Sequence, residues 1–194
     1  MAGFVFRGDP QLGNDVPPAI VDLWEDIDAA GTHGDVFARL LLTDALGAGH
    51  AAILVEFPKT GGAQSARDEM VGGLRPYFVP ILKENIVSWR TTVEGGRTIL
   101  TQLVLYECQM APSGVYAERE RKRYRVFFRE NGVVGYRLYE VAEDQKTLTM
   151  VDAGLYPTQD EIPVAEVPTA GRRGLFESDP PLLDLAYLNV AHYQ

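Results

Sequence analysis

The sequence predicts an α+β fold in which N-terminal amphipathic helices pack on a mainly antiparallel, hairpin-rich sheet. Apolar residues recur at helical spacing in the first part of the chain, alternating segments joined by tight-turn sequences follow, and a further helix begins near the end. Helices followed by a run of hairpin-linked strands are typical of α+β domains. With 194 residues, 46% of them hydrophobic, the chain is long enough to bury a core.

Two helices are expected near the N-terminus, after an arm or lead-in strand over residues 1–15. The first helix begins in the segment 14–18 (NDVPP), which is a typical helix start, and it ends at Gly31. Its apolar face has i, i+3, i+4, i+7 spacing and consists of Ile20, Leu23, Trp24 and Ile27. The second helix begins between Thr32 and Asp35 and ends in the segment 47–49 (GAG), where glycine allows a left-handed stop.

The central part of the chain predicts strands joined by tight turns. Asn131-Gly132 is a strong hairpin signal, and Glu94-Gly95-Gly96 indicates a second hairpin turn. Two prolines in the segment 76–82 indicate an edge strand, because proline cannot donate a ladder hydrogen bond. Residues 58–73 are expected to form a loop. The expected strands are 50–57, 76–82, 85–93, 97–110, 119–129, 133–141, 148–151 and 161–167.

The chain ends with an expected loop over residues 169–181 and the start of a helix. Asp179 is predicted to cap this helix, with Pro180-Pro181 in its first turn. The residues that repeat at helical spacing are Leu182, Leu185, Ala186 and Asn189, with Tyr193 one turn further on. No glycine or proline closes the pattern, so we expect this truncated helix to continue in a longer protein. The expected organisation is an arm over 1–15, an α+β domain over 16–168, and a loop and helix over 169–194.

The charge of the chain limits its partners. The formal net charge is −9, whereas a protein held on nucleic acid by phosphate contacts needs clustered positive charge. This composition still allows a protein that surrounds DNA without gripping it, because strong phosphate contacts would cause friction there. No apolar run approaches the roughly 20 residues that span a bilayer, so no membrane partner is expected.

The sequence offers no pattern for catalysis, cofactor binding or metal binding, so no residue is expected in any of these roles. His33, His50 and His192 are isolated from one another. Cys108 is the only cysteine, which excludes an internal disulfide, and its apolar strand predicts a buried, inert thiol. The glycine pairs at 61–62 and 72–73 lack the Lys-Ser/Thr pair of a phosphate-binding loop.

One charge cluster stands out in the strand over residues 119–129. Four arginines alternate and therefore share one face: Arg119, Arg121, Arg123 and Arg125, here called the arginine row. A functional interpretation is a basic stripe that contacts phosphate or, more in keeping with this acidic chain, an acidic patch on a neighbouring copy. The interpretation that we favour is a solvated or ion-paired face of the sheet.

Several segments of the chain, taken together and in order, are similar to segments of one protein family. They are Gly3–Arg7, Phe37–Arg39, Ala45–Pro58, Leu74–Ile81 (LRPYFVPI), Glu84–Arg90, Asp160–Val164 and Pro180–Tyr193 (PPLLDLAYLNVAHY). This set resembles the portal-like proteins of tailed bacteriophages and prophages, a family long catalogued as a phage domain of unknown function. The resemblance covers nearly the whole chain, but such proteins are typically more than twice as long.

The resemblance implies a structural protein without catalytic activity or cofactor. It implies a ring, commonly of twelve copies, at one capsid vertex, through which DNA is packaged and ejected without sequence-specific contact. Expected partners are further copies, a separate ATP-hydrolysing terminase, and capsid or head–tail proteins; the expected location is the virion, assembled in the bacterial host cytoplasm. This chain would be the wing region of the ring, without the clip and most of the stem. Its C-terminal helix would lead toward the stem, and the apolar face of that helix would be partly exposed in this chain.

Two other classes of protein stay open on the sequence. One is a small α+β enzyme or ligand-binding domain with a pocket between the second helix and the sheet. Its first candidate residues are His50, Glu56, Glu107 and Arg125, and a deep pocket with convergent polar groups would favour it. The other is a head–tail adaptor or another component of the virion.

Overall fold

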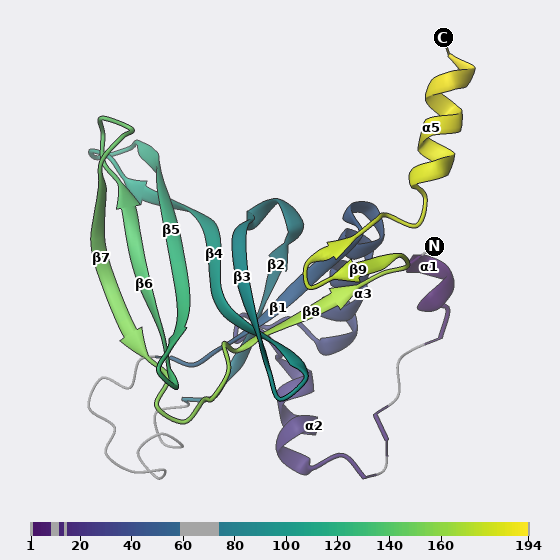
Figure 1. Cartoon of the computed structure of the whole chain (residues 1–194), viewed down its shortest axis with the longest axis horizontal. Coiled ribbons are helices and arrows are strands. Elements are labelled where there is room, and N and C mark those ends of the chain that lie inside the picture. Colours follow the sequence, from purple (N-terminus) through teal and green to yellow (C-terminus); the bar gives the residue numbers. More distant parts are fainter. Residues whose placement is uncertain (1, 9–11, 14, 59–73, 194) are drawn as a thin grey trace. The chain divides into compact units, whose positions relative to one another are not determined.

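The computed structural model describes residues 2–8, 12–13, 15–58 and 74–193, and it confirms the α+β class (Figure 1). The chain divides into two compact units, one formed by Met1–Lys83 with Val164–Gln194 and the other by Glu84–Pro163. The domain boundaries expected at residues 15 and 168 stay predictions. None of the helices in the described residues is long and apolar enough to cross a membrane.

The first unit begins with three helices, α1 (Ala2–Val5), α2 (Pro18–Glu25) and α3 (Gly34–Ala48). Of the arm or lead-in strand expected over residues 1–15, the strand is wrong for residues 2–5, which form a helical turn that the amide of Phe6 closes on the carbonyl of Ala2. The arm stays a prediction. α2 begins at Pro18 as predicted but ends before Gly31, because the amide of Asp26 already turns back to Leu23.

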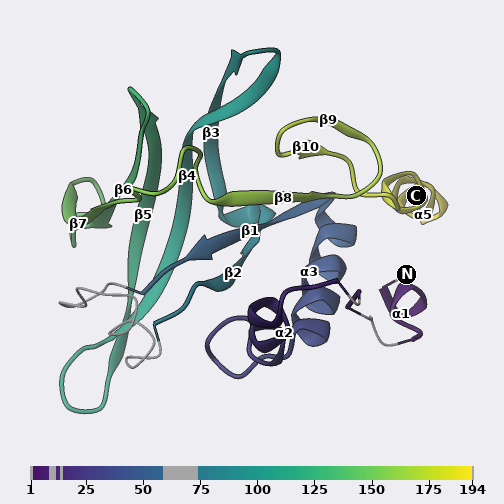
Figure 2. The same cartoon turned by 90° about the horizontal axis from the view of Figure 1, so that it is seen from below.

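A three-stranded antiparallel sheet completes the core of the first unit. Its order is β2-β1-β8, with β1 (His50–Glu56) between β2 (Tyr77–Leu82) and β8 (Val164–Pro168). β2 is therefore an edge strand, as its prolines predicted. α3 packs beside β1 (Figure 2), and the buried apolar cluster around them consists of Ile27, Phe37, Leu41, Ala45 and Ala51. Each large side chain buried in this way contributes about 1.5–3 kcal/mol. The loop expected over 58–73 lies, apart from Pro58, outside the described residues.

The second unit is built on a five-stranded antiparallel sheet with the order β3-β4-β5-β6-β7. The strands are β3 (Ile86–Glu94), β4 (Arg97–Pro112), β5 (Glu118–Glu130), β6 (Val133–Val141) and β7 (Leu148–Leu155). Both predicted hairpins are confirmed. Gly95 and Gly96 have φ angles of 56° and 79°, and Asn131 and Gly132 have 52° and 77°. Two central residues with positive φ match the twist of the flanking strands.

Strands β4 and β5 extend beyond their neighbours as a two-stranded ribbon, here called the β4–β5 arm (residues 106–122). β3 pairs with β4 only as far as Leu105, and β6 pairs with β5 only from Arg123. The expectation of a buried Cys108 is therefore wrong: this residue lies in the arm and is exposed. Its thiol donates a hydrogen bond to Glu120, with Sγ 3.0 Å from Oε1.

The C-terminal segment contains a small hairpin and a helix. β9 (Arg172–Gly174) and β10 (Glu177–Ser178) pair within the stretch that was expected to be a loop, and α5 spans Leu183–His192. The predicted cap at Asp179 is wrong. Its carboxylate instead accepts a hydrogen bond from Arg173 at 2.7 Å, and Leu182 occupies the N-cap position without a side-chain bond. Both prolines thus precede the helix.

Candidate functional site

The C-terminal helix α5 is the most unusual surface of the first unit. None of its residues is buried, although most are apolar; Leu185 is 60% exposed and Leu188 is 68% exposed. Figure 1 shows α5 extending beyond the other elements of this unit. Contiguous apolar surface of this kind usually marks a contact with another molecule. The partial exposure predicted for this helix is confirmed.

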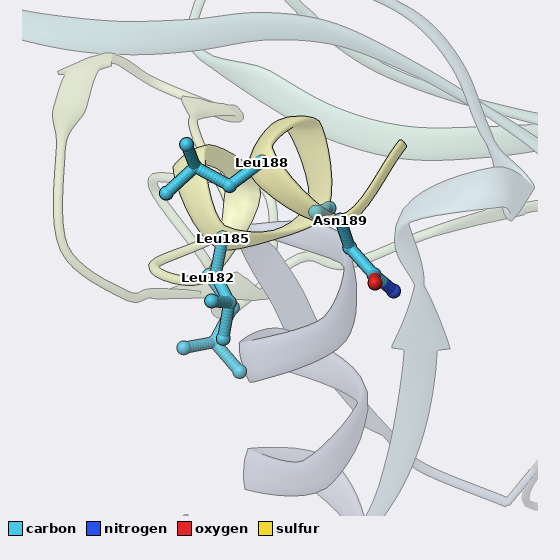
Figure 3. A pocket seen from close by; sticks show the side chains of 5 residues that line it. Leu182, Leu185, Leu188 and Asn189 are labelled. Carbon is cyan, nitrogen blue, oxygen red and sulfur yellow. The ribbon is translucent and has the colours of Figure 1, made fainter. Parts of the chain in front are cut away.

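A shallow, open pocket lies along α5. The residues that line it are Leu182, Leu185, Ala186, Leu188 and Asn189. In Figure 3 the side chains of Leu182 and Leu185 lie close together, whereas Leu188 and Asn189 point elsewhere. Four of these positions belong to the helical repeat predicted from the sequence. The pocket carries a single polar side chain, so it suits apolar contact better than the recognition of a charged ligand.

The segment leading to α5 is held by a polar cluster that we call the Gly49 anchor, formed by Gly49, His50, Thr169 and Ser178. The carbonyl oxygen of Gly49 accepts hydrogen bonds from the amide of Thr169 at 2.9 Å, from the Thr169 hydroxyl, and from the Ser178 hydroxyl at 2.9 Å. Gly49 also ends α3, where its amide bonds to the carbonyl of Ala45. The Gly49 carbonyl thereby joins the end of α3 to Thr169, which follows β8, and to Ser178 in β10.

Glycine is required at this corner for two reasons. Its φ of 99° lies in the left-handed region that favours glycine, and a Cβ at this position would come within 2.3 Å of the carbonyl oxygen of Ser178. The close approach of two backbones fixes the path of the chain toward α5.

His50 is the titratable member of the anchor. It is 2% exposed, and its Nδ1 lies 3.4 Å from the hydroxyl oxygen of Ser178. Its ring also contacts Phe176, with 6.1 Å between ring centroids. Burial lowers the pKa of His50, and the positive charge of Lys83 lowers it further, while Glu166 opposes the shift. His50 is therefore neutral at neutral pH.

Ser178 and His50 do not have the geometry of a nucleophile and its general base. Both residues are buried, and the Ser178 hydroxyl donates its hydrogen to the carbonyl of Gly49 instead of to the imidazole. A base must accept the proton of the nucleophile, and the nucleophile must meet a substrate. The arrangement is suited to holding a backbone segment in place.

The arginine row of the second unit is ion-paired, as the favoured interpretation predicted. The N–O distances are 2.5 Å for Arg119–Glu143, 3.4 Å for Arg121–Glu140, 2.8 Å for Arg123–Glu140 and 2.6 Å for Arg125–Glu107. The hydrogen bond from Arg123 lowers the pKa of Glu140 below its ordinary value. Three carboxylates pair with these four arginines, since Glu140 contacts both Arg121 and Arg123, so each arginine of the row already has an acidic partner. A phosphate group would have to compete with these carboxylates.

The residues suspected of forming an enzyme site are not gathered in one place. His50 and Glu56 lie at the two ends of β1, which separates them by roughly 20 Å at the usual rise per residue. Glu107 and Arg125 belong to the second unit, where they pair with each other. The space between α3 and its sheet, where a pocket was expected, is filled by the apolar cluster.

The other histidines have local partners. The Nδ1 of His33 accepts a hydrogen bond from the amide of Asp35 at 3.2 Å and so caps α3, while His192 contacts the ring of Tyr193. Within residues 2–8, 12–13, 15–58 and 74–193, no cluster of three or more His, Cys, Asp or Glu side chains could hold a metal ion.

Sequence reasoning missed the anchor as a functional feature. The segment 47–49 signalled only the end of a helix, and the partners of Gly49 lie 120 and 129 residues further along the chain. No local pattern points from one of these residues to the others. The chain matches no protein-family model, and no curated protein matches it.

Proposed function

We propose that this protein is a structural component of a tailed-phage particle: the wing portion of a portal-like protein whose ring conducts DNA during packaging and ejection. The observation that carries the proposal is α5, an apolar helix with no buried residue on a base fixed by the Gly49 anchor. An enzyme gathers polar groups in a concave site. An exposed apolar helix on a fixed base suits a contact with further protein.

The charge distribution supports a protein that surrounds DNA but does not grip it. The chain has a net charge of −9, and each arginine of the arginine row is already paired with a carboxylate of the same unit. In the proposed ring, copies contact one another, terminase and capsid or head–tail proteins dock on the assembly, and DNA passes without sequence-specific contact. The proposed location is the virion, assembled in the bacterial host cytoplasm, and the proposed role involves no catalysis.

The α5 surface gives a direct test in the phage or prophage that encodes the chain. A double variant, Leu185→Asp with Leu188→Asp, places charges on the exposed helix, and Val87→Asp is the control because Val87 is 51% exposed on β3. We expect the double variant to yield heads without DNA, while the control assembles normally. Circular dichroism of the purified chains establishes that both variants fold.

The particles also separate the alternatives. Normal DNA-filled, tailed particles from the double variant would overturn the proposal. DNA-filled heads without tails would indicate instead a head–tail adaptor, because such a protein acts after packaging.

A second test concerns DNA directly. We expect the purified chain not to retain double-stranded DNA at physiological salt in a filter-binding assay, since phosphate contacts require unpaired cationic side chains. Retention under these conditions would contradict the proposed surface chemistry.

A further inference from the structure

The Gly49 anchor contains one titratable side chain, the imidazole of His50, which can gain a positive charge in acid. The Ser178 hydroxyl hydrogen is used on the Gly49 carbonyl, so the Ser178 oxygen can only accept from His50, which assigns a hydrogen to Nδ1. A second proton would therefore enter at Nε2 and make the ring a cation. This cation would sit in a site where His50 is 2% exposed and faces the ring of Phe176.

The charged groups around His50 do not offset this burial. Lys83 already caps the end of α3, with Nζ 2.8 Å from the carbonyl oxygen of Ala48, and it repels a second positive charge. Glu166 attracts the charge, but its carboxylate already accepts hydrogen bonds from the amide of Phe176 at 2.7 Å and from Arg172 at 3.0 Å. A buried charge without a dedicated partner is costly.

We propose that the Gly49 anchor is a pH-sensitive latch: when His50 takes up a proton, the segment 176–182 detaches from Gly49 and frees the base of α5. In the detached form His50 meets water and regains the ordinary affinity of histidine for a proton. The latch acts within the first unit and does not depend on the proposed role in a virion.

The sign of the pH dependence follows from proton uptake. The closed anchor disfavours the protonated ring, so the detached form binds more protons once the pH falls below about 6.5, the ordinary pKa of histidine. The ratio of detached to closed molecules then rises by up to about tenfold for each further pH unit. It stops rising when the pH reaches the lowered pKa of the closed form.

Nuclear magnetic resonance of the full chain, uniformly labelled with ¹⁵N and ¹³C, tests the latch. Heteronuclear relaxation of the amides over residues 176–183 is recorded from pH 7.5 to pH 4.5, together with the titration of the histidine rings. We expect these amides to become mobile with the same midpoint as the His50 ring, while residues 97–141 stay rigid. Rigid amides over 176–183 down to pH 4.5 would overturn the proposal.

Variants separate His50 from general acid effects. His50→Gln cannot titrate and should keep residues 176–183 rigid at low pH, whereas the control His33→Gln should open like the unmodified chain. Opening of His50→Gln with an unchanged midpoint would overturn the latch. If His50→Gln is already open at pH 7.5, the variant Lys83→Met provides the test. Removing the positive charge of Lys83 removes its repulsion of protonated His50, so the midpoint of opening must move to higher pH. An unchanged midpoint of opening would refute the proposal.

Discussion

Replacing Gly49 by alanine should loosen the C-terminal segment and destabilise the first unit. The new Cβ would lie 2.3 Å from the carbonyl oxygen of Ser178 and 2.9 Å from the carbonyl carbon of Asp179. Both neighbours are backbone atoms, so the clash cannot be relieved by rotating a side chain. The segment that carries these atoms must therefore move away from the end of α3.

The expected loss can be estimated from two contributions. A non-glycine residue in the left-handed region costs about 1–3 kcal/mol, and φ of Gly49 is 99°. Moving the segment also breaks the hydrogen bond from the Ser178 hydroxyl to the Gly49 carbonyl, worth about 0.5–1.5 kcal/mol. Together these two contributions predict that the free energy of unfolding of the first unit falls by about 1.5–4.5 kcal/mol.

Tryptophan fluorescence during a urea titration can follow the first unit alone. Trp24 lies in α2 of the first unit and Trp89 in β3 of the second, so a Trp89→Phe background leaves Trp24 as the only reporter. The urea midpoint of Gly49→Ala should fall with an unchanged slope, which indicates a change in stability alone.

Gly47 supplies the matched control two residues earlier. It is exposed within α3, and a Cβ there would meet nothing within 4 Å, so Gly47→Ala should stabilise the helix by about 0.5–1 kcal/mol. A loss of stability at Gly49 and a gain at Gly47 would show that the close approach of two backbone segments at Gly49 causes the loss. The reasoning is refuted if Gly49→Ala unfolds at the same urea concentration as the unmodified chain.

Three further changes test other parts of the molecule. Leu103→Ala, at a fully buried position of β4, should cost about 2–5 kcal/mol in a urea titration followed at Trp89; a loss below 1 kcal/mol would contradict the packed core. Glu140→Gln should destabilise the second unit by about 1–2 kcal/mol at pH 7, because it weakens the bond from Arg123. The paired carboxylate of Glu140 has a lowered pKa, so its contribution to stability is present above the ordinary pKa of 4.5 and is lost at lower pH. The free energies of unfolding of the variant and of the unmodified chain should therefore converge in acid. A difference that stays constant with pH would refute the ion pair. Leu185→Asp on the exposed α5 should change the free energy of unfolding of the first unit by less than about 0.5 kcal/mol in a urea titration followed at Trp24, and a larger loss would mean that the helix is packed.

Features set by local chemistry could be predicted from the sequence. The period of the apolar residues located α3, and the Asn131-Gly132 dipeptide located the turn between β5 and β6. Backbone geometry decides such features, and it depends on a few neighbouring residues. The alternation of arginines in β5 likewise predicted one shared, ion-paired face, although the identity of the paired glutamates depends on the strand register.

Features set by distant contacts could not be predicted. Asp179 has the composition of a helix cap, but Arg173 of the β9–β10 hairpin takes its carboxylate. Cys108 has the apolar neighbours of a buried residue, but β3 and β6 both end before reaching it. Nothing near Gly49 in the sequence identifies Ser178 as its partner, because only the folded chain brings the two together.

The exposed thiol of the β4–β5 arm makes the arm chemically addressable. Cys108 is the only cysteine of the chain, so a maleimide dye or spin label enters at one known position without any substitution. The hydrogen bond to Glu120 raises the pKa of this thiol, so the reactive thiolate forms at a more alkaline pH than for an ordinary cysteine and labelling is correspondingly slower near neutral pH. A label at this position reports on the arm itself, whether the protein is alone or in an assembly.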